Sequence, residues 1–272
     1  DADVAVVTSI ALDHQAWLGD TRELIAVEKL GIARPSRPLV IAEVDGPEGF
    51  DKMIAATAAQ PFVIGKDFCL QIDADHFSLT VQTPDGESQC FQQLPTSGLL
   101  PSNKAAAIQA LICAGVKLDN HKLIGALDKL GLTGRQQVLQ VNGRRVILDV
   151  AHNPAAASVL AASLTPIAGR YTAVASVLDD KDWRGIIQPL RGIIAEWRIA
   201  EIGDSDRATK AQTLHEVLYN EGLKGALFAS LEEAFDNAIA EAGEDDTVVV
   251  FGSFHTVTAV LNMQRQRDGC VI

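Results

Sequence analysis

The 272-residue sequence lacks several common functional patterns. It contains no GxxxxGK[ST] phosphate-binding loop and no GxGxxG dinucleotide-binding loop. None of its apolar runs approaches the ~18 residues that a helix needs to cross a bilayer. Its four cysteines include no CxxC pair, which favours ordinary reduced thiols in a cytoplasmic protein. We therefore expect no membrane association, and no P-loop within these residues.

Positive charge is also scarce. The sequence has 23 Lys and Arg against 35 Asp and Glu, a net charge of −12. An acidic protein of this kind is unsuited to general nucleic-acid binding, which needs a basic surface. An anionic ligand would need local positive side chains against this background. With 47% hydrophobic residues, the composition is that of a globular protein long enough for two domains.

The most informative stretch is residues 8–31, TSIALDHQAWLGDTRELIAVEKLG. It follows a β-branched apolar run typical of a buried strand. Either Asp20 or Thr21 can cap a helix that Gly31 can end. Helical spacing places Lys29 on the stripe of Ile25 and Ala26. A lysine there could reach solvent along its aliphatic stem, or lose its proton and become a carbamate. His14 could equally be a hydrogen-bonding loop residue or a ligand.

The remainder of the first half predicts a mixture of elements. We expect strands at 38–42, 61–64, 68–72, 77–82 and 89–94, and helices at 47–59, from 100 onwards and at 119–130. Asn103 falls in the first turn of the second of these helices, where a simple capping role is common. The glycine-bracketed segment 131–134 is the best domain boundary. The domains expected are therefore residues 1–134 and 135–272.

The second half alternates strands and helices after a hairpin with an Asn142-Gly143 turn. Expected strands at 146–150, 172–177, 197–200, 226–229 and 247–251 alternate with helices at 154–164, 183–194, 210–220, 231–242 and from 254. This spacing predicts an α/β fold with a parallel, Rossmann-like sheet.

Two of these strands end in polar clusters. Asp149 precedes His152 in DVAHNP, and its carboxylate could either cap the next helix or bind a ribose hydroxyl. Ser253 lies in GSFHT after the last strand, where backbone N–H groups favour an anion. Arg135, directly after the boundary, could be a solvated charge or could meet phosphate oxygens through its guanidinium fork.

Five motifs together resemble the bacterial dihydrofolate synthase/folylpolyglutamate synthase family of the Mur ligase superfamily. They are TSIALDHQAWLG with EKLGI, LTGRQ at 132–136, DVAHNP, the DKD at 180–182, and GSFHTV. Their order matches the family's, although LTGRQ replaces the usual LPGRF. The resemblance implies part of a P-loop-type ATPase domain with a small antiparallel sheet, followed by a Rossmann-like Mur ligase C-terminal domain.

The resemblance also implies roles for single residues. His14 would bind Mg²⁺ and Lys29, fifteen positions later, would be carbamylated. Asn103, Arg135 and Asp149 would contact ATP, with Arg135 also catalytic. His152, Ser253 and Lys181 would lie at the glutamate site or the cleft, His152 also having a catalytic role.

The implied enzyme is an ATP-dependent amide ligase of folate biosynthesis, a cytoplasmic monomer. It would join L-glutamate to dihydropteroate or to folates through an acyl phosphate, with Mg²⁺. In that family the phosphate loop and two further metal ligands precede TSIALDH. We therefore expect this chain to be the C-terminal portion of a longer protein and inactive alone. Alternatives are a cell-wall Mur ligase, a non-catalytic nucleotide-binding module and an interaction domain.

Overall fold

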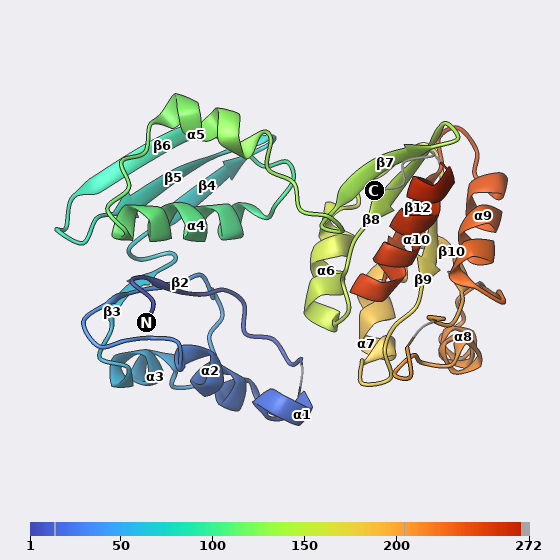
Figure 1. The fold of residues 1–272 in the computed structure, drawn as a ribbon, viewed down its shortest axis with the longest axis horizontal. Helices are drawn as coiled ribbons and strands as arrows, with labels where there is room; N and C mark the ends of the chain where they lie inside the picture. The colour runs from blue at the N-terminus through green and yellow to red at the C-terminus, as the bar shows by residue number, and fades with distance from the viewer. Residues whose placement is uncertain (14, 204, 268–272) are drawn as a thin grey trace. The chain divides into compact units, whose positions relative to one another are not determined.

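The computed structural model describes residues 1–13, 15–203 and 205–267, which form two compact units (Figure 1). The units are Asp1–Gly131 and Leu132–Ile272. The expected boundary after residue 134 therefore lies three residues inside the second unit. Each unit buries its own hydrophobic clusters. In the described residues we find no helix that combines the length and apolar character needed to span a membrane.

The first unit begins with a parallel three-stranded sheet in the order β1-β2-β3. Its strands are β1 (Ala5–Val7), β2 (Pro38–Ile41) and β3 (Gln60–Val63). Helices α2 (Arg22–Leu30) and α3 (Phe50–Ala56) pack on one face, where Ile25 and Ala26 meet Leu39 and Ile41. A short helix, α1 (Gln15–Leu18), precedes α2. Of the two candidate caps, Asp20 and Thr21, it is Thr21 that caps α2, with its side chain accepting a hydrogen bond from the Leu24 N–H.

Helix α4 (Pro101–Cys113) packs between the parallel sheet and an antiparallel sheet of three strands. The antiparallel strands are β4 (Cys69–Asp73), β5 (His76–Gln82) and β6 (Ser88–Pro95), and α5 (Asn120–Leu127) packs on β6. Alternation along β5 is as predicted, because Phe77, Leu79 and Val81 are buried on one side. Contact on two faces explains why α4 is alanine-rich and has no clear polar side.

Two buried polar side chains of α4 hold the antiparallel sheet in place. The Gln109 amide donates to the Gln82 carbonyl oxygen (2.6 Å) and accepts from the Gln82 N–H (3.2 Å), extending the hydrogen bonding of β5. The Lys104 ammonium donates to the carbonyl oxygens of Pro95 (2.7 Å) and Ser97 (2.5 Å). Burial lowers the pKa of Lys104, while the charge of Asp128 opposes that shift.

The second unit contains a six-stranded sheet in the order β11-β10-β9-β12-β8-β7. All neighbouring pairs are parallel except β7 with β8. Its strands are β7 (Gln137–Val141), β8 (Arg144–Leu148), β9 (Tyr171–Ala175), β10 (Ile194–Ile199), β11 (Gly225–Leu227) and β12 (Thr247–Phe251). The β7–β8 turn has φ of +50° at Asn142 and +73° at Gly143, as its type I′ sequence predicts.

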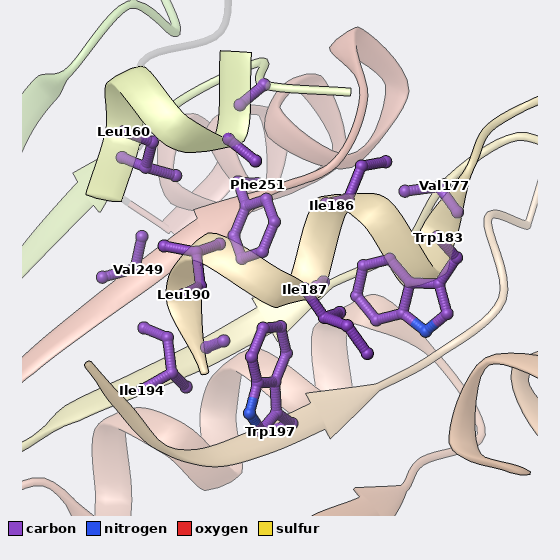
Figure 2. Close-up of a cluster of buried hydrophobic side chains, with 14 of the residues drawn as sticks. Leu160, Val177, Trp183, Ile186, Ile187, Leu190, Ile194, Trp197, Val249 and Phe251 are labelled. Atoms are coloured by element: carbon purple, nitrogen blue, oxygen red, sulfur yellow. The ribbon is translucent and has the colours of Figure 1, made fainter. Parts of the chain in front are cut away.

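Helices cover both faces of this sheet (Figure 1). One face carries α6 (Pro154–Ser163), α7 (Trp183–Ile187) and α8 (Ala211–Asn220), and the other carries α9 (Leu231–Glu241) and α10 (Phe254–Arg267). Figure 2 shows Trp183 and Trp197 with Phe251 between α7 and the sheet. The two indoles meet edge to face at 5.7 Å, which locks this side of the core. The expected α/β class is confirmed.

Three local expectations need correction. Helix α3 begins at Phe50 after a left-handed Gly49, so Pro47 precedes the helix instead of opening it. Helix α7 ends at Ile187 because Pro189 cannot donate a backbone hydrogen bond, and only a 3₁₀ turn, Gln188–Leu190, continues it. Residues 194–196, part of them expected as helix, therefore begin β10.

Candidate functional site

The carboxyl ends of β8, β12 and β9 meet at one edge of the second sheet. The Asp149 N–H donates to the Val250 carbonyl oxygen (2.9 Å), which continues the pairing of β8 with β12. Strand order reverses here, because β9 to β11 extend the sheet away from β8 and β12 then returns between β8 and β9. In α/β sheets the crevice at such a reversal is the usual ligand site.

Asp149 is buried at this edge and bonded through both carboxylate oxygens. Oδ1 accepts from the Ala151 N–H (2.8 Å) and Oδ2 from the Gln136 N–H (3.0 Å). Burial raises the pKa of Asp149, and these two backbone hydrogen bonds and the charges of Arg135 and His152 oppose that shift. Each carboxylate oxygen has a second lone pair with which it could accept from a ligand hydroxyl.

The proposed helix cap is a different residue. Asn153 is the N-cap of α6, and its Oδ1 accepts from the Ala156 N–H (2.8 Å). Asp149 therefore does not cap the helix, which corrects one of the two alternatives drawn from the sequence. Between them, the half-buried His152 places Nδ1 2.8 Å from the Val150 carbonyl oxygen. Since a carbonyl only accepts, Nδ1 has the proton and a neutral ring has its lone pair on Nε2.

Ser253 is buried directly before α10. Its hydroxyl oxygen accepts from the Thr256 N–H (2.9 Å), and its Oγ lies 2.8 Å from that of Thr256, which donates to the Ser176 carbonyl oxygen (2.9 Å). Gly252 has φ +117°, and a Cβ there would stand 2.2 Å from the same carbonyl oxygen. The helix start is thus pressed against the end of β9, and only glycine fits the turn.

Arg135 projects from a loop that is held on both sides. Gly134 is packed against Val150 and Val257, which a Cβ would approach to 2.8 and 3.1 Å, and its carbonyl oxygen accepts from the Val150 N–H (2.8 Å). On the other side, the Gln136 N–H is bound by Asp149. The exposed Arg135 guanidinium lies 5.8 Å from the centre of the Phe254 ring.

Lys181 lies on the loop that follows β9. Its side chain is only 6% exposed, and Nζ lies 3.2 Å from the Asp180 carboxylate, which also accepts from Arg207 (2.9 Å). Both cations lower the pKa of Asp180 against the effect of its partial burial. Helix α7 follows this loop directly and lies against the start of α6, because a Cβ on Gly185 would stand 2.7 Å from Pro154. The predicted residues of the second half therefore gather at one edge.

In the first unit, Lys29 lies beside the end of β1. It is half-buried, and Nζ donates to the Ser9 carbonyl oxygen (2.7 Å). The ammonium thus has an acceptor and is not enclosed among apolar side chains, although it shares a helix with the buried Ile25 and Ala26. His14 lies outside the described residues.

The peptide groups of Ile10 are held from two sides. Glu43, 11% exposed and just beyond β2, accepts from the Ile10 N–H and, through Oε1, from the Asp45 N–H (2.9 Å). Arg22 donates through Nε to the Ile10 carbonyl oxygen (2.9 Å). These two side chains fix the start of the 8–14 segment. Asn103 is exposed in the first turn of α4.

Several of these supporting residues escaped the sequence analysis. Gln136, Asn153, Phe254 and Thr256 act through contacts with residues distant in the chain or through capping geometry. Only Asn153 had a usable signal, since it directly precedes Pro154, a favoured first helical residue. No cluster of three or more His, Cys, Asp or Glu side chains suited to a metal occurs among residues 1–13, 15–203 and 205–267.

Comparison with known proteins gives consistent matches. Residues 134–254 match the family "Mur ligase, glutamate ligase domain". The chain is 36% identical over 269 residues to the dihydrofolate synthase/folylpolyglutamate synthase of Escherichia coli (strain K12), covering 97% of this chain and 60% of that protein. Two solved structures extend this similarity to the fold.

The structure of "E.coli FolC in complex with DHPP and ADP" has a TM-score of 0.88 at 34% identity, covering 98% of this chain and 63% of that one. A bifunctional folylpolyglutamate synthase/dihydrofolate synthase "with Mn, AMPPNP and L-Glutamate bound" has a TM-score of 0.86 at 33% identity, covering 97% and 62%. This chain thus spans about three fifths of the length of these relatives.

Proposed function

Because the chain belongs to the dihydrofolate synthase/folylpolyglutamate synthase family of Mur ligases, we propose that it serves the ATP-dependent addition of L-glutamate to dihydropteroate or a folate. The observation that supports this most directly is the site at the edge of the second sheet. A buried carboxylate (Asp149), a loop arginine (Arg135) and a serine-capped helix start (Ser253) meet where an α/β sheet binds ligands.

The proposed reaction has two steps. A substrate carboxylate oxygen attacks the γ-phosphorus of ATP, the bond to ADP breaks, and an acyl phosphate forms. The amine of L-glutamate then attacks the acyl carbon, losing a proton, and phosphate leaves. Both steps involve crowded negative charge, so the protein contributes chiefly by positioning the reactants and by offsetting charge.

Some of the site residues are assigned to ATP and others to L-glutamate. Asp149 accepts from the ribose hydroxyls, Arg135 donates to the phosphates, and Asn103 contacts the base. Ser253, His152 and Lys181 bind L-glutamate, and His152 can also accept a proton at Nε2. The Gln136 N–H donates to Asp149, so the backbone beside Arg135 is held next to the carboxylate proposed to bind the ribose, which supports this assignment.

A divalent cation completes the proposal, and Mg²⁺ is the cation we propose. Relatives were solved with Mn. His14 is the ligand in this chain, and carbamylated Lys29 supports the cation. The described residues include no set of three suitable side chains, so the described part of the chain does not by itself fit a complete metal site.

The cellular location and the oligomeric state are part of the same proposal. We place the enzyme in the cytoplasm as a monomer. Cys69, Cys90 and Cys113 are free thiols, which suits a reducing compartment. Cys270 lies outside the described residues.

A chimaera tests the function. The aligned region of the E. coli relative is replaced by these 272 residues, and release of ADP is measured with dihydropteroate and L-glutamate. We expect release to require both substrates. Asp149→Ala should chiefly raise the KM for ATP and Ser253→Ala that for L-glutamate, whereas Ser158→Ala, on the exposed side of α6, should change neither. Exchanged KM effects would refute these assignments, and nucleotide hydrolysis independent of both substrates would refute the ligase function.

A further inference from the structure

The neighbours of Arg135 fix its backbone but do not fix its side chain. Its neighbours Gly134 and Gln136 are fixed to the sheet, by close packing and by the hydrogen bond to Asp149. The backbone at Arg135 is therefore fixed, but an arginine side chain retains several rotatable bonds and loses entropy when it is held in one pose. A further contact is therefore needed to hold the Arg135 side chain in one conformation.

Phe254 is the side chain in contact with that guanidinium. It is the first residue of α10 and 58% exposed, so its ring contributes little to the core. Its backbone is fixed because Ser253 and Thr256 bind each other on either side of it. The Arg135 Cζ lies 5.8 Å from the ring centre, within the range of a cation–π contact.

The arrangement points away from a general surface role. Single exposed apolar side chains are common on protein surfaces, so what distinguishes Phe254 is its contact with the Arg135 guanidinium. Burial raises the pKa of the nearby Asp149 carboxyl, and the charge of this guanidinium opposes that shift. The ring therefore keeps a positive group at the carboxyl edge of the sheet, beside the carboxylate proposed to bind the ribose.

We propose that Phe254 is a positioning residue for Arg135. Its ring holds the guanidinium in the pose that meets the phosphates of a nucleotide whose ribose is bound at Asp149. This inference rests on the proposed function, since it requires Arg135 to bind nucleotide phosphate. Phe254 itself does not touch the nucleotide.

The test is a titration of the 272-residue chain with ADP and, separately, with adenosine, followed by NMR, which measures weak dissociation constants. Phe254→Leu keeps an apolar, helix-compatible side chain but removes the ring face, and Phe254→Tyr keeps it. We expect Phe254→Leu to weaken ADP binding about two- to fivefold and leave adenosine binding unchanged. Phe254→Tyr should behave as the wild type. In an Arg135→Ala background, Phe254→Leu should have no further effect.

The outcomes separate this inference from the function on which it rests. If the wild type does not bind ADP, or if Arg135→Ala leaves ADP affinity unchanged, the nucleotide role of this edge is wrong, and the inference with it. If Arg135→Ala weakens ADP binding but Phe254→Leu does not, the inference alone is wrong. Equal loss of ADP and adenosine affinity in Phe254→Leu, or additivity with Arg135→Ala, would also overturn it, since the ring would then contact the nucleoside or support the fold.

Discussion

At the scale of single residues, Asp149 has both a structural role and a proposed binding role. Its carboxylate ties the Arg135 loop to the end of β8 by accepting from the Gln136 and Ala151 N–H groups. Burial of that charge raises its pKa, and the surrounding hydrogen bonds recover part of the cost. Such a group makes a pH-dependent contribution to folding, because its folded and unfolded states bind protons differently.

The first prediction concerns that pH dependence. A raised folded pKa gives a contribution to stability that is complete below the unfolded value of about 4 and is lost as pH rises through the folded pKa. Asp149→Asn removes the titration. The melting temperature of the wild type minus that of Asp149→Asn should therefore decrease as pH is raised from about 4 towards 7. A difference that grows over this range would show that the hydrogen bonds outweigh burial.

The second prediction concerns Lys29. A carbamate requires a neutral amine and an accessible nitrogen, and Nζ of Lys29 is half-buried beside the Ser9 carbonyl oxygen. With ¹³C-bicarbonate and Mg²⁺, the chain should show a carbamate carbon resonance that is absent from Lys29→Arg. Lys52→Arg, which alters an exposed lysine, is the control and should leave the signal unchanged. A spectrum indifferent to Lys29→Arg would remove the carbamate from the proposal.

At the scale of elements, the start of α10 is the most constrained junction of the second unit. Gly252 adopts φ +117° with the Ser176 carbonyl beside it, and Ser253 and Thr256 complete the turn. Two strands and a helix contribute to this junction, so a change at Gly252 moves β9, β12 and α10 together. The need for glycine at position 252 can therefore be measured as a loss of folding stability.

The third prediction is that Gly252→Ala lowers the free energy of unfolding by about 2–4 kcal/mol, because backbone strain adds to a clash that backbone atoms cannot avoid. Gly143→Ala is the matched control. It has φ +73° but open space around a Cβ, so strain alone should cost about 1 kcal/mol. Denaturant unfolding followed by tryptophan emission measures both, because Trp183 and Trp197 are buried in this unit. Equal losses would show that the turn can relax.

At the scale of the whole molecule, the junction between the units is the most accessible part of the chain's middle. Residues 128–133 are exposed, whereas Gly134 is buried and Gln136 is bound by Asp149. Proteolysis depends on local opening, which a pinned loop resists. A protease should therefore cut within residues 128–133 before it cuts the loop that begins at Gly134.

The fourth prediction is that limited trypsin digestion cuts first after Lys129 and leaves a stable fragment beginning at Leu130. Arg135 is exposed, but cleavage after it needs the 134–136 loop to leave the sheet. Lys129→Gln should slow formation of this fragment. First cleavage after Arg135 would show that the loop is mobile, and degradation of the fragment would show that the second unit does not fold alone.

The local elements and the order of the motifs could be predicted from the sequence. Caps at Thr21 and Asp119, the Asn142-Gly143 turn and strand–helix alternation all depend on neighbouring residues, which is why they could be predicted. The early end of α7 also depends on a local residue, Pro189. The predicted helix over residues 183–194 did not take this proline into account. The motifs likewise indicated the family, the one conclusion that geometry alone could not reach.

Which side chains contact each other depends on how whole elements pack together. Lys104 is buried against carbonyl groups at the end of β6 and in the loop after it, Asp149 holds Gln136, and Arg135 meets Phe254 more than a hundred positions away. A hydrogen bond or a cation–π contact needs placement to within a fraction of an ångström, whereas periodicity specifies only which face of an element is buried. Packing of whole elements sets those distances, so no local pattern could have revealed them.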